Sequence, residues 1–237
     1  MNTQISDLID THFKSFPGDV SPLQLTEIGK QQWNILKGDV PLPAAVLLKS
    51  ALENNARWMQ NFLRYTQVSL APHGKTSMSP QLFKQQLADG AWGITVATYQ
   101  QFYVCWQMGV RHILMANQLV DPASIRGVFA VLQKDPQLHF YCLVDSLAAA
   151  DLLNKHAQQW QLNKPVDVLL EVGLPSVKGG RTGCRDINEA LTVANYISTL
   201  PTLQLAGIEC FEGLFPNITE VETLLNQVTT VATLCDE

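Results

Sequence analysis

A lysine lies where a short apolar run gives way to a loop, in the segment Leu70-Ala-Pro-His-Gly-Lys75-Thr-Ser. The run before it, Val68 to Pro72, is typical of a buried strand. A partly desolvated lysine amine loses its proton and becomes a nucleophile that can form a Schiff base with a carbonyl group. Position alone favours the other interpretation, a solvated lysine at a strand end, because lysine is rarely buried.

Composition excludes several classes of protein. The chain has 237 residues, of which 46% are hydrophobic and 16% charged, with a net charge of -5. It can bury one sizeable core, and the excess of acid without a Lys/Arg stripe argues against nucleic-acid binding. No apolar stretch approaches the ~20 residues of a membrane span, and no signal-like segment begins the chain. Five cysteines without a C-x-x-C pair predict neither a disulfide framework nor a zinc ribbon, so we expect a cytoplasmic protein.

Short apolar runs alternate with helical patterns along the chain. The strand-like runs lie at residues 44–48, 68–72, 92–97, 112–116, 139–145, 166–172 and 203–211. Runs that are apolar on both faces are typical of buried parallel strands, and the alternation predicts an α/β fold of the (β/α)8 TIM-barrel type. Chemistry in such a barrel lies at the carboxyl ends of the strands. The main competitor, a doubly wound sheet, usually carries a G-x-G-x-x-G turn, which this sequence lacks.

The predicted strands are too few for a closed barrel. An eight-stranded barrel usually takes ~250 residues. Residues 1–40 have the pattern of an N-terminal helical extension, so we predict an incomplete barrel domain over residues 41–237. The chain stops inside a helical pattern that starts near Glu220, and we therefore expect a fragment that ends before the barrel closes.

Several sequence blocks, in order, resemble one family. They are Pro-Leu-Pro-Ala-Ala-Val-Leu at 41–47, Leu-Ala-Pro-His-Gly-Lys-Thr at 70–76, Ala-Trp-Gly-Ile-Thr-Val-Ala-Thr at 91–98, Ile-Leu-Met-Ala-Asn-Gln-Leu-Val at 113–120, Glu-Val-Gly at 171–173, Gly-Arg-Thr-Gly-Cys at 180–184 and Leu-Ala-Gly-Ile-Glu-Cys-Phe-Glu-Gly at 205–213. Together they resemble the fold-type III pyridoxal-phosphate (PLP) enzymes of the alanine racemase N-terminal domain superfamily. The branch is that of D-serine dehydratase and D-threonine aldolase, and the bacterial amino acid deaminases resemble the chain most.

The resemblance implies a PLP-binding barrel followed by a β-rich second domain. The strand at 44–48 would pair with that second domain, which leaves six of the eight barrel strands here. The phosphate-binding loop, and the ligands of any divalent metal, would lie beyond residue 237. The full-length protein would be a homodimer whose sites borrow residues from the partner chain.

The resemblance also assigns roles to particular residues. Lys75 would form the Schiff base with PLP and, once the substrate has displaced it, would move the Cα proton. Arg181 would lie beside the PLP ring, where its charge disfavours protonation of the pyridine nitrogen; Arg185 is the alternative alignment. His73 lies two residues before Lys75 and so on the same side of the strand. It would either pack or hydrogen-bond near the cofactor, or contact only the residues that surround the cofactor site.

Three further polar residues follow strands at the same end of the predicted barrel. Thr98 and Asn117 would line the cofactor pocket, with helix capping or turn chemistry as the alternative. For Asp145-Ser146 that alternative is favoured. Glu212 stands where the aldolase relatives have histidine, so we place it in the substrate pocket. No metal site is predicted within the chain.

The predicted function is that of a PLP-dependent amino acid deaminase or dehydratase, a carbon-nitrogen lyase. A hydroxy amino acid such as D-serine would yield a keto acid and ammonia, with the D configuration implied by the resemblance alone. The alternatives are a D-threonine-type aldolase or amino acid racemase on the same site, a non-catalytic PLP-binding protein, and an inactive fragment.

Overall fold

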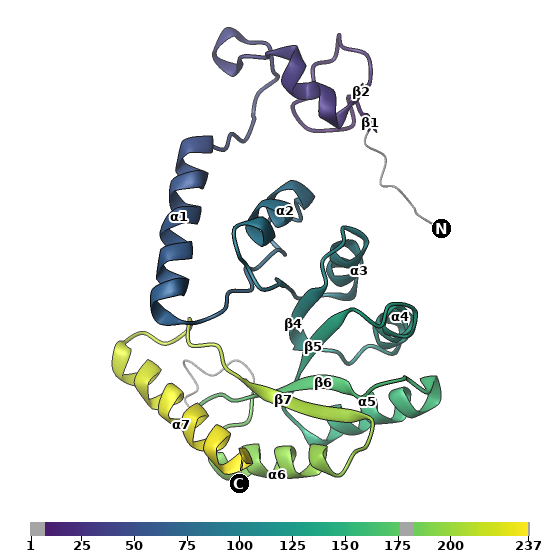
Figure 1. Cartoon of the computed structure of the whole chain (residues 1–237), viewed down its shortest axis with the longest axis vertical. Coiled ribbons are helices and arrows are strands. Elements are labelled where there is room, and N and C mark those ends of the chain that lie inside the picture. Colours follow the sequence, from purple (N-terminus) through teal and green to yellow (C-terminus); the bar gives the residue numbers. More distant parts are fainter. Residues whose placement is uncertain (1–7, 176–182, 237) are drawn as a thin grey trace. The chain divides into compact units, whose positions relative to one another are not determined.

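The computed structural model describes residues 8–175 and 183–236. The chain divides into two compact units, Met1–Arg57 and Trp58–Glu237, with the boundary inside helix α1, Lys49–Thr66 (Figure 1). No helix in the described part is both long and apolar enough to cross a membrane.

The first unit is small. A two-residue strand β1, Leu8–Ile9, pairs antiparallel with β2, Leu23–Gln24, and the 3-10 turns η1, Leu25–Gln31, and η2, Ile35–Lys37, follow. Phe16 and Trp33 meet edge to face, with ring centroids 5.7 Å apart. The described helices before residue 41 are therefore 3-10 turns, and the predicted domain boundary at residue 41 stays a prediction.

The prediction of a strand at residues 44–48 is wrong for this chain. These residues form neither strand nor helix, and α1 begins directly after them. Val46, Leu47 and Leu48 are each more than 60% exposed. Residues form a strand only where a neighbouring strand offers backbone partners, and no described strand pairs with this run.

The second unit is built on a parallel sheet in the order β3-β4-β5-β6-β7. Its strands are β3, Ile94–Val96; β4, His112–Gln118; β5, His139–Val144; β6, Val166–Glu171; and β7, Leu203–Glu209. Its helices after α1 are α2, Pro80–Ala88; α3, Tyr99–Gln107; α4, Pro122–Lys134; α5, Leu147–Trp160; α6, Ile187–Ser198; and α7, Ile218–Asp236. Sequential strands are neighbours throughout, as the predicted barrel type requires, and the described sheet is not closed.

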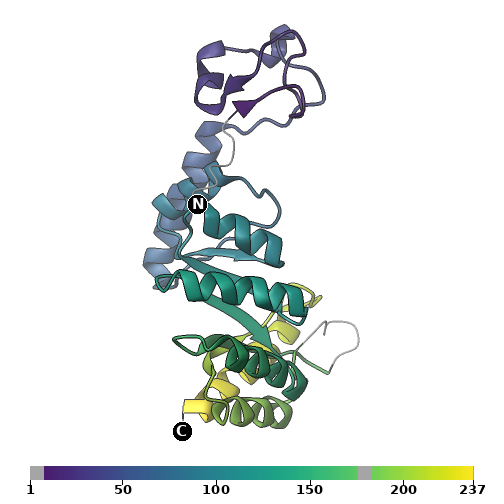
Figure 2. The ribbon, with the colours of Figure 1, turned by 90° about the vertical axis from the view of Figure 1, so that its right-hand side faces the viewer.

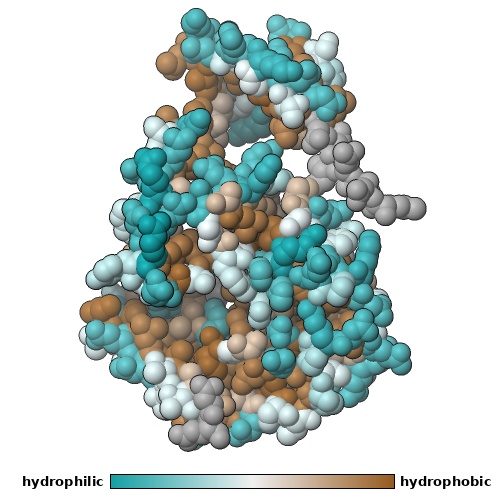
Figure 3. Space-filling model, in the orientation of Figure 1, coloured by the Kyte–Doolittle hydropathy of each residue, from teal (hydrophilic) through white to brown (hydrophobic). Residues whose placement is uncertain are grey.

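The core lies between the sheet and the helices that cover one of its faces (Figure 1 and Figure 2). Successive side chains of a strand alternate between the two faces. On β5, Phe140 and Cys142 are buried, and the Phe140 ring meets Phe102 of α3 at 5.0 Å between centroids. Tyr141, between them, is on the less buried inner face. Figure 3 shows apolar surface gathered where the sheet is open.

Residues Leu70 to Gly74 run beside β3. Together with the five strands of the sheet they make six strand positions of the barrel. The backbone N–H of Trp92 donates to Leu70 (2.7 Å) and that of Thr95 donates to Pro72 (2.8 Å). Only His73 forms a bridge of the parallel ladder, with Thr95. Pro72 has no N–H to donate. The predicted strand at 68–72 therefore lies beside β3, as expected, but does not form a regular ladder of backbone hydrogen bonds with it.

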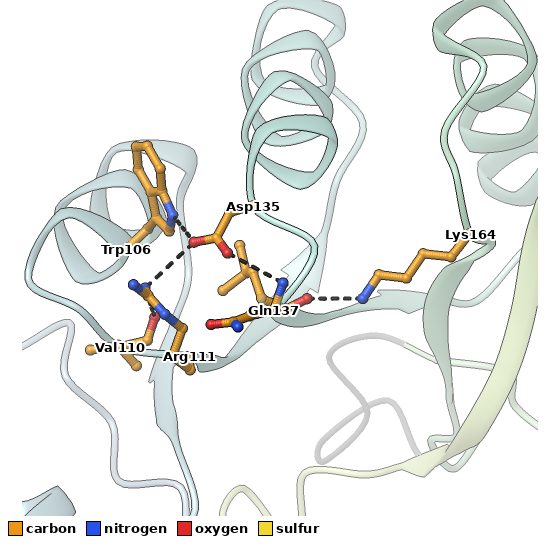
Figure 4. Close-up of polar contacts among 7 residues, drawn as sticks. Trp106, Val110, Arg111, Asp135, Gln137 and Lys164 are labelled. Atoms are coloured by element: carbon orange, nitrogen blue, oxygen red, sulfur yellow. Dashed lines mark hydrogen bonds and ion pairs between the residues drawn. The ribbon is translucent and has the colours of Figure 1, made fainter. Parts of the chain in front are cut away.

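The amino end of the sheet is tied together by polar contacts between its loops (Figure 4). Asp135 accepts hydrogen bonds from the indole nitrogen of Trp106 (2.8 Å) and from the backbone N–H of Gln137 (3.3 Å). Arg111 forms an ion pair with the same carboxylate at 3.6 Å, and Lys164 donates to the carbonyl oxygen of Leu138 (3.0 Å). These contacts join the loops before β4, β5 and β6, and they make this the structural end of the sheet.

Candidate active site at the carboxyl ends of the strands

Polar side chains gather at the opposite end of the sheet. Lys75 follows the Leu70–Gly74 segment, and Gln118 and Glu171 end β4 and β6. Asp145 follows β5 and Glu212 lies shortly beyond β7. The strands are parallel, so all these residues lie at one edge of the sheet, the edge at which barrel enzymes carry out chemistry.

Lys75 is held by its glycine neighbour. Gly74 donates its N–H to the carbonyl oxygen of Thr95 (2.8 Å) and accepts from the N–H of Met78 (2.9 Å), so the backbone turns directly at Lys75. A Cβ on Gly74 would stand 2.7 Å from Ile94 Cγ2 and 2.8 Å from the ring of Phe83. Glycine therefore lets this segment approach β3 and α2 closely, and the Lys75 side chain stays exposed at the mouth.

His73 lies two residues before Lys75 and forms a bridge with Thr95. Partial burial of the imidazole, and then the positive charge of Lys75, lower the pKa of His73 below its ordinary value. The ring is therefore neutral near pH 7, with one nitrogen that donates and one that accepts. A neutral imidazole beside an amine can accept a proton or orient a polar group.

Thr98 and Asn117 both connect strand ends to their surroundings. The Thr98 hydroxyl accepts from the N–H of Gln101 (3.4 Å) and caps α3, while the Gln101 side chain accepts from the N–H of Ala97 (2.9 Å). Asn117 donates to the carbonyl oxygen of Ala97 (3.1 Å) and accepts from the N–H of Gln118 (3.0 Å). These contacts support helix capping as the role of Thr98. Contact with the cofactor stays a prediction for both residues.

The structure brings together three side chains that the sequence interpretation did not combine. The Gln118 side-chain nitrogen donates to Asp145 Oδ2 (3.2 Å) and to Glu171 Oε2. Glu171 is only 4% exposed. Ser146 caps α5 by accepting from the N–H of Ala149 (3.3 Å), so Asp145 is not the cap and turns toward Gln118 instead. The signal was present in the sequence, because each of the three residues ends or directly follows an apolar run.

The remaining predicted residues lie on the loops after β6 and β7. Arg181 lies outside the described residues. Arg185, its alternative, donates its guanidinium to the carbonyl oxygen of Leu174 (3.3 Å) and its backbone N–H to Glu189 (2.6 Å). Glu212 is exposed, and its place in a substrate pocket stays a prediction. Within the described ranges, no three His, Cys, Asp or Glu side chains are grouped to hold a metal ion.

Comparisons with known proteins agree with this architecture. Residues 48–237 match the family described as alanine racemase, N-terminal domain. D-threonine aldolase of Arthrobacter sp. is 30% identical over 176 residues, which cover 73% of this chain and 44% of that protein. D-threo-3-hydroxyaspartate dehydratase of Delftia sp. (strain HT23) is 32% identical over 111 residues, 47% of this chain and 28% of that protein.

A solved structure shows the same fold. The crystal structure of D-threonine aldolase from Filomicrobium marinum superposes with a TM-score of 0.70 at 21% identity. The match covers 81% of this chain and 51% of that one. The chain thus spans about half the length of the relatives it matches.

Proposed function

The chain belongs to the fold-type III PLP-dependent proteins of the alanine racemase N-terminal domain family, and on that premise we propose that it is part of a lyase acting on a D-3-hydroxy amino acid. In the proposed reaction a substrate such as D-serine loses its β-hydroxyl group as water, and hydrolysis of the released enamine takes up one water and gives a keto acid and ammonia. The observation that carries the proposal is Lys75, an exposed amine fixed at the carboxyl end of the sheet beside a neutral imidazole.

The described residues fit the cofactor. The Lys75 amine can hold the aldehyde carbon of PLP covalently, and its backbone is fixed by the hydrogen bonds of Gly74 to Thr95 and Met78. Bound PLP supplies an electron sink for the bonds at the substrate Cα. In the proposed reaction the Lys75 amine takes the proton from Cα, and His73, neutral near pH 7, orients a polar group beside it.

A D-threonine-type aldolase is the second candidate. The match to the Arthrobacter D-threonine aldolase over 73% of this chain favours it. The two reactions break different bonds, Cβ–O in the dehydratase and Cα–Cβ in the aldolase. Glu212, which by resemblance replaces a histidine of the aldolases, supports the dehydratase. We further propose that the full-length protein is a cytoplasmic homodimer, and that any metal it uses is bound outside this chain.

The test combines trapping of the cofactor with product analysis. The chain is incubated with PLP, reduced with borohydride and digested, and we expect the cofactor on the peptide that contains Lys75. Lys75→Ala should abolish this label, whereas Lys84→Ala, an exposed lysine on α2, should keep it. Label on another lysine, or none, contradicts the proposal.

The full-length protein is then given D-serine and D-threonine. Pyruvate and ammonia from D-serine support the dehydratase, and glycine and acetaldehyde from D-threonine support the aldolase. Interconversion of the D and L forms without either set of products would identify a racemase and refute both candidates.

A further inference from the structure

Gln118 holds two carboxylates with one side-chain nitrogen. Its Nε2 atom donates to Asp145 and to Glu171, which come from the ends of two neighbouring strands. Ionised carboxylates only accept hydrogen bonds, so the nitrogen of the carboxamide must face them and its oxygen must point away. Among the described residues no donor contacts that oxygen, and it is not among the buried polar atoms without a partner. The carboxamide oxygen is therefore an oriented acceptor open to the inside of the sheet.

An irregularity in β4 puts Gln118 at this level. Met115 pairs with Cys142 of β5, but the next pair joins Gln118 to Leu143, so β4 carries two extra residues. A regular strand would place Ala116 opposite Leu143. Bulges of this kind occur beside active sites, where they redirect a side chain. Here the bulge replaces a methyl group by a carboxamide that reaches both neighbouring carboxylates.

The network lies within reach of a molecule held by Lys75. Parallel strands are spaced about 4.8 Å apart, so β4, two positions from the Lys75 segment, is roughly 10 Å away. A group attached to the end of a lysine side chain and directed across the mouth would lie above β4 to β6. The network would then lie beneath that group, with Glu171 almost fully buried within it.

We propose that Gln118, Asp145 and Glu171 form a polar floor beneath the group held by Lys75, and that its negative charge stabilises the protonated form of that group. The inference rests on the proposed function, because it takes PLP as the group. Gln118 is a positioning residue here: it keeps two like charges apart and in place. Among the described residues, the other titratable side chains at this end of the sheet include His73, Cys184, Glu209, Cys210 and Glu212, with Arg185 after β6.

The test is a pH titration of the visible absorbance of the PLP-loaded chain. Glu171→Gln and Asp145→Asn each remove one charge and keep the shape of the side chain. Asp145 and Glu171 are three and four strand positions from the Lys75 segment, roughly 14 and 19 Å, and the lysine side chain with its attached group spans part of that distance. A unit charge roughly 10 Å from the titrating group, at an effective dielectric constant of about 25, shifts the midpoint by about one pH unit. We expect both variants to lower the midpoint by about that amount, and Gln118→Glu to raise it. Asp167→Asn, at the amino end of β6, and Gln158→Glu, in the last turn of α5, make the same charge changes at the opposite end of the sheet and should leave it unchanged.

The outcomes separate the two proposals. A visible band in the wild-type chain whose midpoint does not move in any network variant refutes the floor and leaves the proposed function intact. Shifts in the same direction for removed and added charge also refute it, since they would report loosened structure. A wild-type chain that shows no band refutes both. Circular dichroism of each variant confirms that it is folded before it is titrated.

Discussion

Replacing Gly74 by alanine tests whether close packing positions Lys75. The added Cβ would stand 2.7 Å from Ile94 Cγ2 and 2.8 and 2.9 Å from two ring carbons of Phe83. Carbon atoms in ordinary contact are about 3.5–4.0 Å apart, so roughly 1 Å of overlap must be relieved. Ile94 and Phe83 are 0% and 1% exposed, which leaves neither side chain free space.

Overpacking of this kind costs about 1–3 kcal/mol, which for a chain of this size lowers the melting temperature by about 2–12 °C. The Leu70–Gly74 segment also has to move away from β3, and Lys75 moves with it. We therefore expect Gly74→Ala to lower the yield of borohydride-trapped PLP as well. Urea unfolding followed by circular dichroism measures the first effect, and mass spectrometry of the labelled peptide measures the second.

Two variants make the experiment decisive. Gly29→Ala adds the same methyl group where no heavy atom lies within 4 Å, so it should not destabilise the chain. Phe83→Leu makes room beside Gly74, and the double variant with Gly74→Ala should cost less than the sum of the single variants. If Gly74→Ala is as stable as the wild type and traps PLP normally, the packing argument is wrong. Strict additivity with Phe83→Leu would place the strain elsewhere.

Three further variants probe the scaffold. Burial and the neighbouring His139 lower the pKa of His112, so at acid pH the unfolded chain binds more protons than the folded chain. The unfolding free energy should therefore fall as the pH drops below about 6.5. His112→Phe should flatten this pH dependence in urea titrations from pH 5 to 8. An unchanged slope would contradict the assignment. Asp186→Ala removes the cap that accepts from the N–H of Glu189 (2.9 Å) and should cost about 1 kcal/mol, read as a lower urea midpoint at constant m. Trp106→Phe keeps an aromatic ring but loses the hydrogen bond from the indole nitrogen to Asp135. It should lower the unfolding free energy by about 1 kcal/mol in the same measurement. No change would mean that this hydrogen bond contributes nothing.

Local signals predicted the elements of the sheet unit well. The runs at 92–97, 139–145, 166–172 and 203–211 contain β3, β5, β6 and β7, and the run at 112–116 covers all but the last two residues of β4. Runs that are apolar on both faces are buried between the helices and the barrel interior. Asp121 caps α4, which begins at Pro122, and its carboxylate accepts from the N–H of Ser124 (2.7 Å). The run at 44–48 failed because its conformation depends on a partner strand, and a sequence pattern carries no information on whether that partner is present.

Strand ends alone place Lys75 and Asn117 at the carboxyl end of the sheet, but they do not predict the contacts that each side chain makes. Counting along β4 makes Asn117 and Gln118 equal candidates for the pocket, since both close the same apolar run. The two extra residues of the bulge give them different contacts: Asn117 bonds to the carbonyl oxygen of Ala97, and Gln118 reaches Asp145 and Glu171. Register is a property of two strands together, so one strand's sequence does not contain it. The same reasoning applies to Asp145, whose acidic side chain is released from capping only because Ser146 caps α5 in its place. Polar residues at the ends of barrel strands are thus best assigned in adjacent pairs. The side chain of one member hydrogen-bonds to the backbone, and the side chain of the other can face the pocket.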